Sequence, residues 1–336
     1  MRVAILSSIA WRTPPRKYGP WEQVASLLTE GLVARGFEVT LFATADSVTN
    51  ATLDATCPTP YAEDSSIDPK VAECLHISNL MEKAEQFDLI HNHFDFLPLT
   101  YTKLVKTKVL TTIHGFSSKK ILDVYRKYNA HTSYISISDA DRSPDLNYLA
   151  TVYNGIDAHA FGYVPNIGDY LLFFGRIHPD KGTSEAIQIA QMTSMPLKIA
   201  GLIQDESYFK QEVEPHIDGR NVMYLGNVGP SERNILLGGA SALLHPIRFE
   251  EPFGLSVVEA MFCGTPVIAF KRGSMPELIV DQKTGFLVDT VHQAARAVIQ
   301  LSRIERAECR RWAESKFSKE QMVEGYVAVY EQLLSR

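Results

Sequence analysis

Four pieces of the N-terminal sequence indicate the fold: Val3-Ala4-Ile5-Leu6, the amphipathic segment 21–35, Gly36 and Val39-Thr40-Leu41-Phe42. The two short apolar runs are nearly unbroken, as expected of strands that are covered on both faces. Between them apolar residues recur at helical spacing, and Gly36 is typical of the residue that follows a helix. A strand, a helix and a second strand in this order predict a parallel sheet with helices on both faces.

The same alternation continues along the chain in two series, separated by residues 154–169. That segment contains Asn, Gly, Pro and Asp without a sustained period, so it is predicted to be a linker. We therefore expect two open α/β domains, with ligands bound at the carboxyl ends of the strands, in a cleft between the domains. The remaining strands are predicted at residues 89–90, 109–113, 134–137, 170–174, 197–200, 222–225, 242–245, 267–270 and 285–288.

Composition narrows the class of protein. The chain has 336 residues, more than one hydrophobic core usually serves, and its formal net charge of −6 argues against a general nucleic-acid binder. It contains no run of about 18 uncharged apolar residues, and the first apolar run is too short for a secretion signal. The four cysteines are scattered without a C-x-x-C pair, which favours reduced thiols. These features predict a cytoplasmic protein.

The strongest chemical motif is Glu251-Pro252-Phe253-Gly254-Leu255-Ser256-Val257-Val258-Glu259, directly after the predicted strand 242–245. Helical periodicity begins near Gly254, and a glycine at a helix start lets a phosphate approach free backbone N–H groups. Glu251 is expected in the loop and Glu259 inside the helix, where they could hold a sugar hydroxyl and a ribose hydroxyl respectively. The alternative is that both are ordinary surface and helix-face carboxylates.

Two further loops carry candidate phosphate ligands. Arg176 and Lys181 lie together in residues 174–182, after a predicted strand, and could clamp a diphosphate with a planar fork and a point charge. Gly19 precedes the first helix and could be a second phosphate seat, although the loop lacks the G-x-G-x-x-G pattern. A solvated basic loop and a simple turn glycine are the respective alternatives.

Histidines follow two predicted strands of the first series. His91 and His93 bracket Asn92, and His114 follows the strand 109–113. We expect these side chains to face the ligand side rather than the core. No further Cys or His completes a metal-ligand set, so no metal site is predicted.

The C-terminal segment 320–334 is predicted to be a separate amphipathic helix. Its apolar residues share one face: Met322, Val323, Tyr326, Tyr330 and Leu333. Ordinary core packing and a return to the first domain are both compatible with this pattern.

Several of these motifs together resemble glycosyltransferase family 4, over nearly the whole chain. Besides the motif 251–259 and the pair Arg176 and Lys181, the resemblance rests on residues 18–22, 35–41, 153–157, 264–269, 275–279 and 284–288. It implies a GT-B fold, with two Rossmann-like α/β/α domains facing across a cleft and a C-terminal helix that crosses back. The expected parts are an acceptor-side domain at 1–160, a nucleotide-sugar domain at 161–317 and the helix at 318–336.

The family implies transfer of a hexosyl group from a UDP or GDP sugar to an acceptor hydroxyl, with retention of configuration. No metal and no cofactor besides the nucleotide sugar is expected. The residues that the resemblance places at the donor are Gly19, Arg176, Lys181, Gly254, Leu255 and Glu259. Those that it places at the reaction centre are Glu251, His114, Arg176 and Lys181. Many members of the family have a second glycine where this chain has Pro20. Proline lacks the N–H that could donate to a phosphate, and it suits the first position of a helix.

The acceptor is not readable from the sequence, and a sugar, a lipid or another small molecule fits the family. Lys119, Lys120, Arg126 and Lys127 make one acceptor-side segment basic, which is compatible with peripheral membrane contact or with a merely solvated surface. Two other functions share the expected architecture: a nucleotide-sugar epimerase, which needs no acceptor, and a non-catalytic sugar-binding protein.

Overall fold

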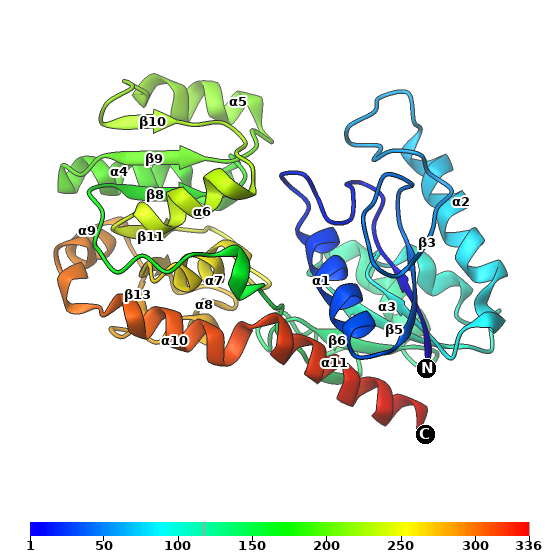
Figure 1. Cartoon of the computed structure of the whole chain (residues 1–336). Helices are drawn as coiled ribbons and strands as arrows, with labels where there is room; N and C mark the ends of the chain where they lie inside the picture. Colours follow the sequence, from blue (N-terminus) through cyan, green and yellow to red (C-terminus); the bar gives the residue numbers. More distant parts are fainter. Residues whose placement is uncertain (117, 336) are drawn as a thin grey trace. The chain divides into compact units, whose positions relative to one another are not determined.

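The computed structural model describes residues 1–116 and 118–335, without the side chain of Lys119. It divides into two compact units (Figure 1). The first unit comprises residues 1–155 together with 319–336, and the second comprises residues 156–318. In each unit a parallel sheet lies between helices, which is the layered α/β arrangement that the sequence predicts.

The sheet of the first unit has seven strands in the order β3-β2-β1-β4-β5-β6-β7, and all paired neighbours are parallel. The chain starts in the middle of this sheet and adds strands outward in both directions, as in Rossmann folds. The strands are β1 Arg2–Leu6, β2 Glu38–Phe42, β3 Thr52–Asp54, β4 Leu89–Asn92, β5 Lys108–Ile113, β6 Ser133–Ser136 and β7 Tyr148–Thr151.

The sheet of the second unit has six parallel strands in the order β10-β9-β8-β11-β12-β13. It repeats the outward order of the first sheet, so β8 and β11 are central neighbours whose carboxyl ends meet at one edge. The strands are β8 Leu171–Phe174, β9 Leu197–Ala200, β10 Val222–Tyr224, β11 Ala242–His245, β12 Val267–Phe270 and β13 Gly285–Val288.

Most connections between strands contain a helix. The helices are α1 Pro20–Ala34, α2 Pro69–Glu82, α3 Leu122–Tyr128, α4 Thr183–Thr193, α5 Glu206–Tyr208, α6 Pro230–Gly239, α7 Leu255–Phe262, α8 Met275–Leu278, α9 Val291–Ile299, α10 Arg306–Phe317 and α11 Lys319–Leu334. Pro20 is the first residue of α1, the position that the sequence predicts for it.

The predicted strands are all present, with ends that differ by one or two residues. Two strands were not predicted, β3 and β7, and both lie at edges of the first sheet. Neither contains a fully buried residue, so neither has the apolar pattern that reveals the central strands.

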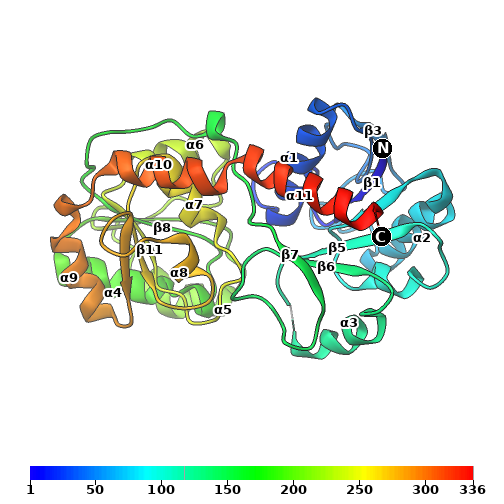
Figure 2. The ribbon, with the colours of Figure 1, turned by 90° about the horizontal axis from the view of Figure 1, so that it is seen from below.

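Helix α11 belongs to the first unit, although it directly follows α10 of the second. It packs on α1, and Figures 1 and 2 both show the two helices side by side. The contact is close at Gly31, where an added Cβ would lie 2.4 Å from Cγ2 of Val323. The predicted return of the C-terminal helix to the first domain is therefore confirmed.

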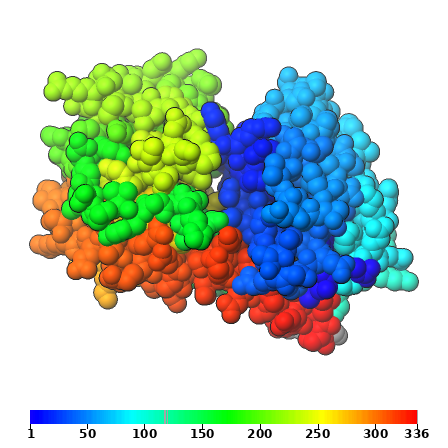
Figure 3. Space-filling model, viewed as in Figure 1, coloured from blue at the N-terminus to red at the C-terminus, as the bar shows by residue number. Residues whose placement is uncertain are grey.

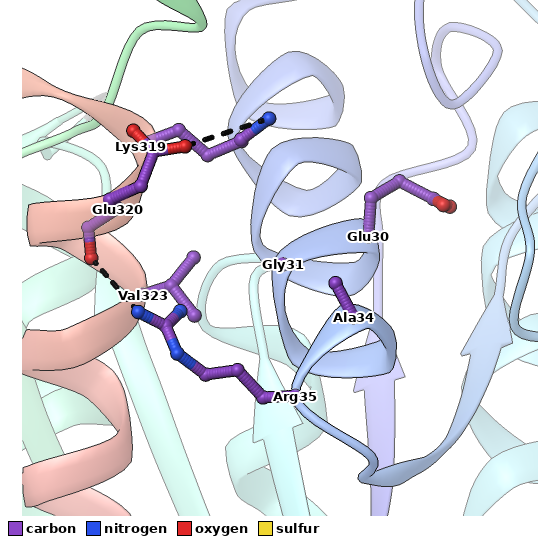
Figure 4. Close-up of a pocket in the computed structure, with 7 residues that line it drawn as sticks. All are labelled: Glu30, Gly31, Ala34, Arg35, Lys319, Glu320 and Val323. Carbon is purple, nitrogen blue, oxygen red and sulfur yellow. Dashed lines mark hydrogen bonds and ion pairs between the residues drawn. The ribbon is translucent and has the colours of Figure 1, made fainter.

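A small surface groove lies where α1 and α11 diverge. Figure 4 shows its lining residues, which are Glu30, Gly31, Ala34, Arg35, Lys319, Glu320 and Val323. The Arg35 guanidinium donates to the Glu320 carbonyl at 3.5 Å across one end of the groove. The space-filling view likewise shows α11, in red, against the blue surface of the first unit (Figure 3). None of the helices described is both long enough and apolar enough to cross a membrane.

Candidate functional site

In the second unit, a hydrogen bond and an ion pair connect the loops after β8 and β11 at the carboxyl edge of the sheet. The Arg248 N–H donates to the Asp180 carbonyl at 2.7 Å, and the Arg248 guanidinium pairs with Glu185. Gly182 has a φ of 76°, and an added Cβ would lie 2.0 Å from the Pro246 carbonyl oxygen. Only glycine fits this backbone contact without distortion, so Gly182 allows the two loops to pack against each other.

This loop pair brings Lys181 and Glu251 into contact as a buried ion pair. The Lys181 ammonium donates to a Glu251 carboxylate oxygen, and the two side chains are 14% and 11% exposed. His245 Nε2, at the end of β11, lies 3.5 Å from the same carboxylate oxygen. Burial by itself raises the pKa of Glu251, but the charge of Lys181 and the neighbouring His245 lower it to about 2. Glu251 is therefore an ionised acceptor at neutral pH.

Helix α7 begins at Leu255, four residues after Glu251. Gly254 caps the helix with a φ of 99°, and an added Cβ would lie 2.8 Å from Cε of Met275. The Gly254 carbonyl accepts from the N–H groups of Val257 and Val258 at 3.1 and 3.4 Å. The N–H of Leu255 precedes these bonds, in the first turn, where helix geometry provides no acceptor. Such N–H groups at a helix start are suited to an anion, and phosphate binding at Gly254 and Leu255 stays a prediction.

Glu259 lies in the second turn of α7 and is buried. Its carboxylate is 3.1 Å from the guanidinium of Arg233, on α6, which itself lies 5.4 Å from the ring centroid of Phe161. Burial raises the pKa of Glu259, and Arg233 opposes that rise. The sequence did not identify Arg233, because nothing in the spacing of α6 and α7 shows which side chains meet.

Arg176 occupies the loop after β8, as predicted, but it donates to the side-chain oxygen of Gln204. The same loop is fastened to the segment after β9, since the N–H of Ile177 donates to the Leu202 carbonyl at 2.8 Å. Arg176 and Lys181 thus come from one loop, yet each has its own partner inside the unit. A clamp of both cations on one diphosphate stays a prediction.

In the first unit, Gly19 caps α1, and the loop before it folds closely over the glycine. An added Cβ at Gly19 would lie 2.7 Å from Pro15 Cβ and 3.1 Å from a Glu22 carboxylate oxygen. Glu22 is buried in the first turn of α1 and accepts from the Trp11 N–H at 3.3 Å. Burial raises the pKa of Glu22 to about 7. The sequence did not predict a buried carboxyl group, that of Glu22, beside the predicted phosphate-binding residue Gly19.

His114 follows β5 and is half-buried. Its Nε2 lies 2.9 Å from His93 Nδ1, and its ring stacks on Trp21 at a centroid distance of 5.6 Å. Burial lowers the pKa of His114 to about 3, so the ring is neutral. The expectation that His91 and His93 also face a ligand is wrong, because β4 continues to Asn92 and both rings are fully buried.

The basic segment of the first unit is partly neutralised. Arg126 pairs with Asp123 at 2.9 Å and with Asp145 at 2.5 Å, while Lys119 is outside the described side chains. Among residues 1–116 and 118–335, no group of three or more His, Cys, Asp or Glu side chains is placed to hold a metal ion.

Comparisons with known proteins agree with this geometry. The family model for glycosyl transferases group 1 matches residues 164–318, and that for glycosyltransferase family 4 matches residues 22–159. An uncharacterised glycosyltransferase of Methanocaldococcus jannaschii is 28% identical over 282 residues, which cover 76% of this chain and 78% of that protein.

Solved structures show the same fold over the full length. A glycosyltransferase involved in avilamycin A biosynthesis has a TM-score of 0.74 at 23% identity, covering 100% of this chain and 98% of that one. The Anabaena protein HepE, in complex with UDP and glucose, has a TM-score of 0.77 at 18% identity, covering 98% and 99%. The two Rossmann-like units and the two family models agree that this chain belongs to glycosyltransferase family 4, with the GT-B fold.

Proposed function

We propose that this protein transfers a hexosyl group from a nucleoside-diphosphate sugar to an acceptor hydroxyl, with retention of configuration and without a metal ion. The observation that carries the proposal is the buried Lys181–Glu251 pair beside the start of α7. A cation, an ionised carboxylate and free helix N–H groups in one place fit a ligand with both sugar hydroxyls and phosphates. HepE, which shares the fold, binds UDP and glucose.

The donor is assigned to residues of the second unit by chemical type. Lys181 and the N–H groups of Gly254 and Leu255 oppose the negative charge of the diphosphate. Arg176 adds a guanidinium when it leaves Gln204 for the phosphate. Glu259, held by Arg233, accepts from ribose hydroxyls, as the family resemblance implies.

The reacting sugar is assigned to Glu251 and His114, and Gly19 is assigned to the diphosphate. Glu251 accepts from its hydroxyls, because the carboxylate is ionised and can only accept. His114 contacts the sugar near the anomeric carbon, and Gly19 lies under the diphosphate. These two roles rest on the family resemblance.

The chemical step follows from the charges. The bond between the anomeric carbon and the leaving phosphate oxygen breaks, so positive charge develops on the sugar and negative charge on the diphosphate. Fixed positive groups such as Lys181 stabilise that negative charge most when it is fully developed. The acceptor oxygen attacks from the face that the phosphate leaves, and its proton passes to the departing phosphate oxygen. The configuration is thereby retained without a protein nucleophile, unlike in retaining glycosidases.

A donor panel tests the proposal. The protein is incubated with UDP-, GDP- and ADP-hexoses, and mass spectrometry follows release of nucleoside diphosphate with and without sugar or lipid acceptors. We expect turnover with the sugar donors of one nucleotide base only, and we expect EDTA to leave the rate unchanged. The anomeric coupling of the product in NMR is expected to match that of the donor. An inverted product or a trapped glycosyl-enzyme adduct would contradict the mechanism.

The same panel separates the two rival functions. An epimerase would convert the nucleotide sugar to an isomer without any acceptor. A sugar-binding protein would bind free hexose in calorimetry and show no affinity for UDP, GDP or ADP. Either result would overturn the proposed transferase.

A further inference from the structure

A line of three histidines in the first unit connects His114 to helix α11. His114 Nε2 lies 2.9 Å from His93 Nδ1, and His93 Nε2 lies 3.3 Å from His91 Nδ1. His91 Nδ1 lies 2.7 Å from the hydroxyl of Tyr330. His91, His93 and Tyr330 are fully buried, so the line runs through the protein interior from a half-buried ring to the C-terminal helix.

The inner end of the line is enclosed by hydroxyl groups. His91 Nε2 lies 2.8 Å from Thr112 Oγ1, which in turn lies 2.9 Å from the hydroxyl of Tyr326. Tyr326 and Tyr330 are one helical turn apart on α11 and both face β4 and β5. Burial raises the pKa of both phenols well above the ordinary value, so their hydroxyls keep their protons.

Neutral rings in such a line cannot choose their protons independently. A neutral imidazole has one donor nitrogen and one acceptor nitrogen, and every hydrogen bond needs one of each. Burial lowers the pKa of His91, His93 and His114, which keeps all three rings neutral. The tautomer of one ring therefore fixes that of the next. The three histidines together have only two sets of tautomers, in which the hydrogen bonds run in opposite directions along the line.

The hydroxyl of Tyr330 selects one of these two sets of tautomers. A phenol O–H is a good donor, and a neutral imidazole nitrogen is a stronger acceptor than a phenol oxygen, so Tyr330 donates to His91 Nδ1. The lone pair of that nitrogen is shared, in a three-centre hydrogen bond, with the N–H at His93 Nε2 at the longer distance of 3.3 Å, because two facing lone pairs would repel. His93 Nδ1 is then an acceptor for the N–H at His114 Nε2. The remaining nitrogen of His114, Nδ1, carries a lone pair, and the stacked Trp21 fixes the plane of the ring.

We propose that Tyr330 is a positioning residue that acts through His91 and His93 to hold His114 in its Nε2–H tautomer. Nδ1 of His114 is thereby kept as an acceptor for a hydroxyl of the transferred sugar. The contact with sugar rests on the proposed function, whereas the tautomer of His114 is a property of the free protein. Helix α11 thus contributes to the chemistry as well as to packing.

Side-chain ¹⁵N NMR of the free protein at neutral pH tests the tautomer directly. In the unsubstituted protein we expect the proton of His114 on Nε2. Tyr330→Phe keeps the ring and removes the hydroxyl, and we expect His114 to show the Nδ1–H tautomer or a mixture. His93→Gln, which interrupts the line without changing α11, is expected to release the tautomer in the same way. A proton on Nδ1 at the outset, or an unchanged tautomer in both variants, would overturn the inference.

Tyr134→Phe is the matched control. Its buried hydroxyl donates to the Tyr125 carbonyl at 2.8 Å, in the same unit but outside the line of histidines. This variant loses a hydrogen bond of the same kind, so a general loosening of the domain would appear in it too. We expect no change in the tautomer of His114.

Turnover separates the two parts of the proposal. With the donor identified, Tyr330→Phe is expected to lower kcat about tenfold, the scale set by one hydrogen bond, and to change KM for the donor less than about twofold. A shifted tautomer with unchanged kcat would overturn the contact between His114 and sugar. A shifted tautomer in a protein without any transferase activity would reject the proposed function and leave the role of Tyr330 supported.

Discussion

Lys181→Met removes the ammonium group that contacts Glu251 and keeps an unbranched side chain. The cost follows from burial, because both partners are less than one-sixth exposed, at 14% and 11%. The pKa of Glu251, about 2 against an ordinary 4.5, corresponds to about 3 kcal/mol in favour of the ionised form. Removing one partner of a buried ion pair generally costs about 3–5 kcal/mol. We expect the free energy of unfolding at pH 7 to fall by about 3 kcal/mol.

The contribution of Glu251 to stability depends on pH. A carboxyl with a lowered pKa stabilises the native protein above pH 4.5, and this contribution is lost as the pH falls through about 2. In Lys181→Met the burial of Glu251 is unopposed by the ammonium, so its pKa rises and protonation restores stability. Urea unfolding at pH 7 and pH 4 should therefore show a smaller difference between the two proteins at the lower pH. Lys181→Met with Glu251→Gln should recover most of the loss at pH 7.

The same substitution should slow turnover. Loss of one fixed positive donor to a developing oxyanion costs about a hundredfold in rate. Lys198→Met is the matched control, because its ammonium lies over the Tyr170 ring at 3.7 Å, in the same unit. We expect a near-normal rate in that control. A near-normal rate in Lys181→Met, with an equal loss of stability at both pH values, would refute the role of the pair.

Three further substitutions test other parts of the structure. Gly31→Ala should lower the free energy of unfolding by about 1–2 kcal/mol, since its Cβ would lie 2.4 Å from Val323 Cγ2, and adding Val323→Ala should reverse the loss in urea titrations. Gly182→Ala should lose at least about 2 kcal/mol, because its φ is 76° and Pro246 O is 2.0 Å from the new Cβ; an unchanged calorimetric Tm would contradict this. Glu22 has a pKa raised to about 7, so native stability should fall by about 3 kcal/mol from pH 4.5 to 7, and Glu22→Gln should remove that slope in unfolding curves.

The central strands of both sheets were predictable, because a strand covered on both faces needs a continuous apolar run. The edge strands β3 and β7 were not, since three or four partly exposed residues carry no such pattern. The spacing alone left the position of α11 open, and only the family resemblance predicted its return to the first domain. Its apolar face was evident from the spacing of Tyr326 and Tyr330, but a periodic face does not show which domain covers it.

The site was predictable in its parts and less so in its pairings. Glu251 and Lys181 were identified in separate loops by their place after strands. Their contact depends on two central strands that are neighbours in the sheet although they are far apart in the chain. The burial of His91 was missed because β4 is two residues longer than its apolar run, and His93, directly after the strand, is buried as well. Polar residues inside a strand give no signal unless their buried partners are known, and the partners of His91 lie on β5 and on α11.

The return of α11 makes the first unit discontinuous in the chain, with the whole second unit inserted before its last helix. During synthesis the ribosome releases the first sheet early, but Tyr326 and Tyr330 emerge only after about 170 further residues have been made, since residue 326 lies 171 positions beyond residue 155. Until then the buried rings of His91 and His93 lack their covering helix. The first domain can therefore complete its core only after the second domain has been synthesised.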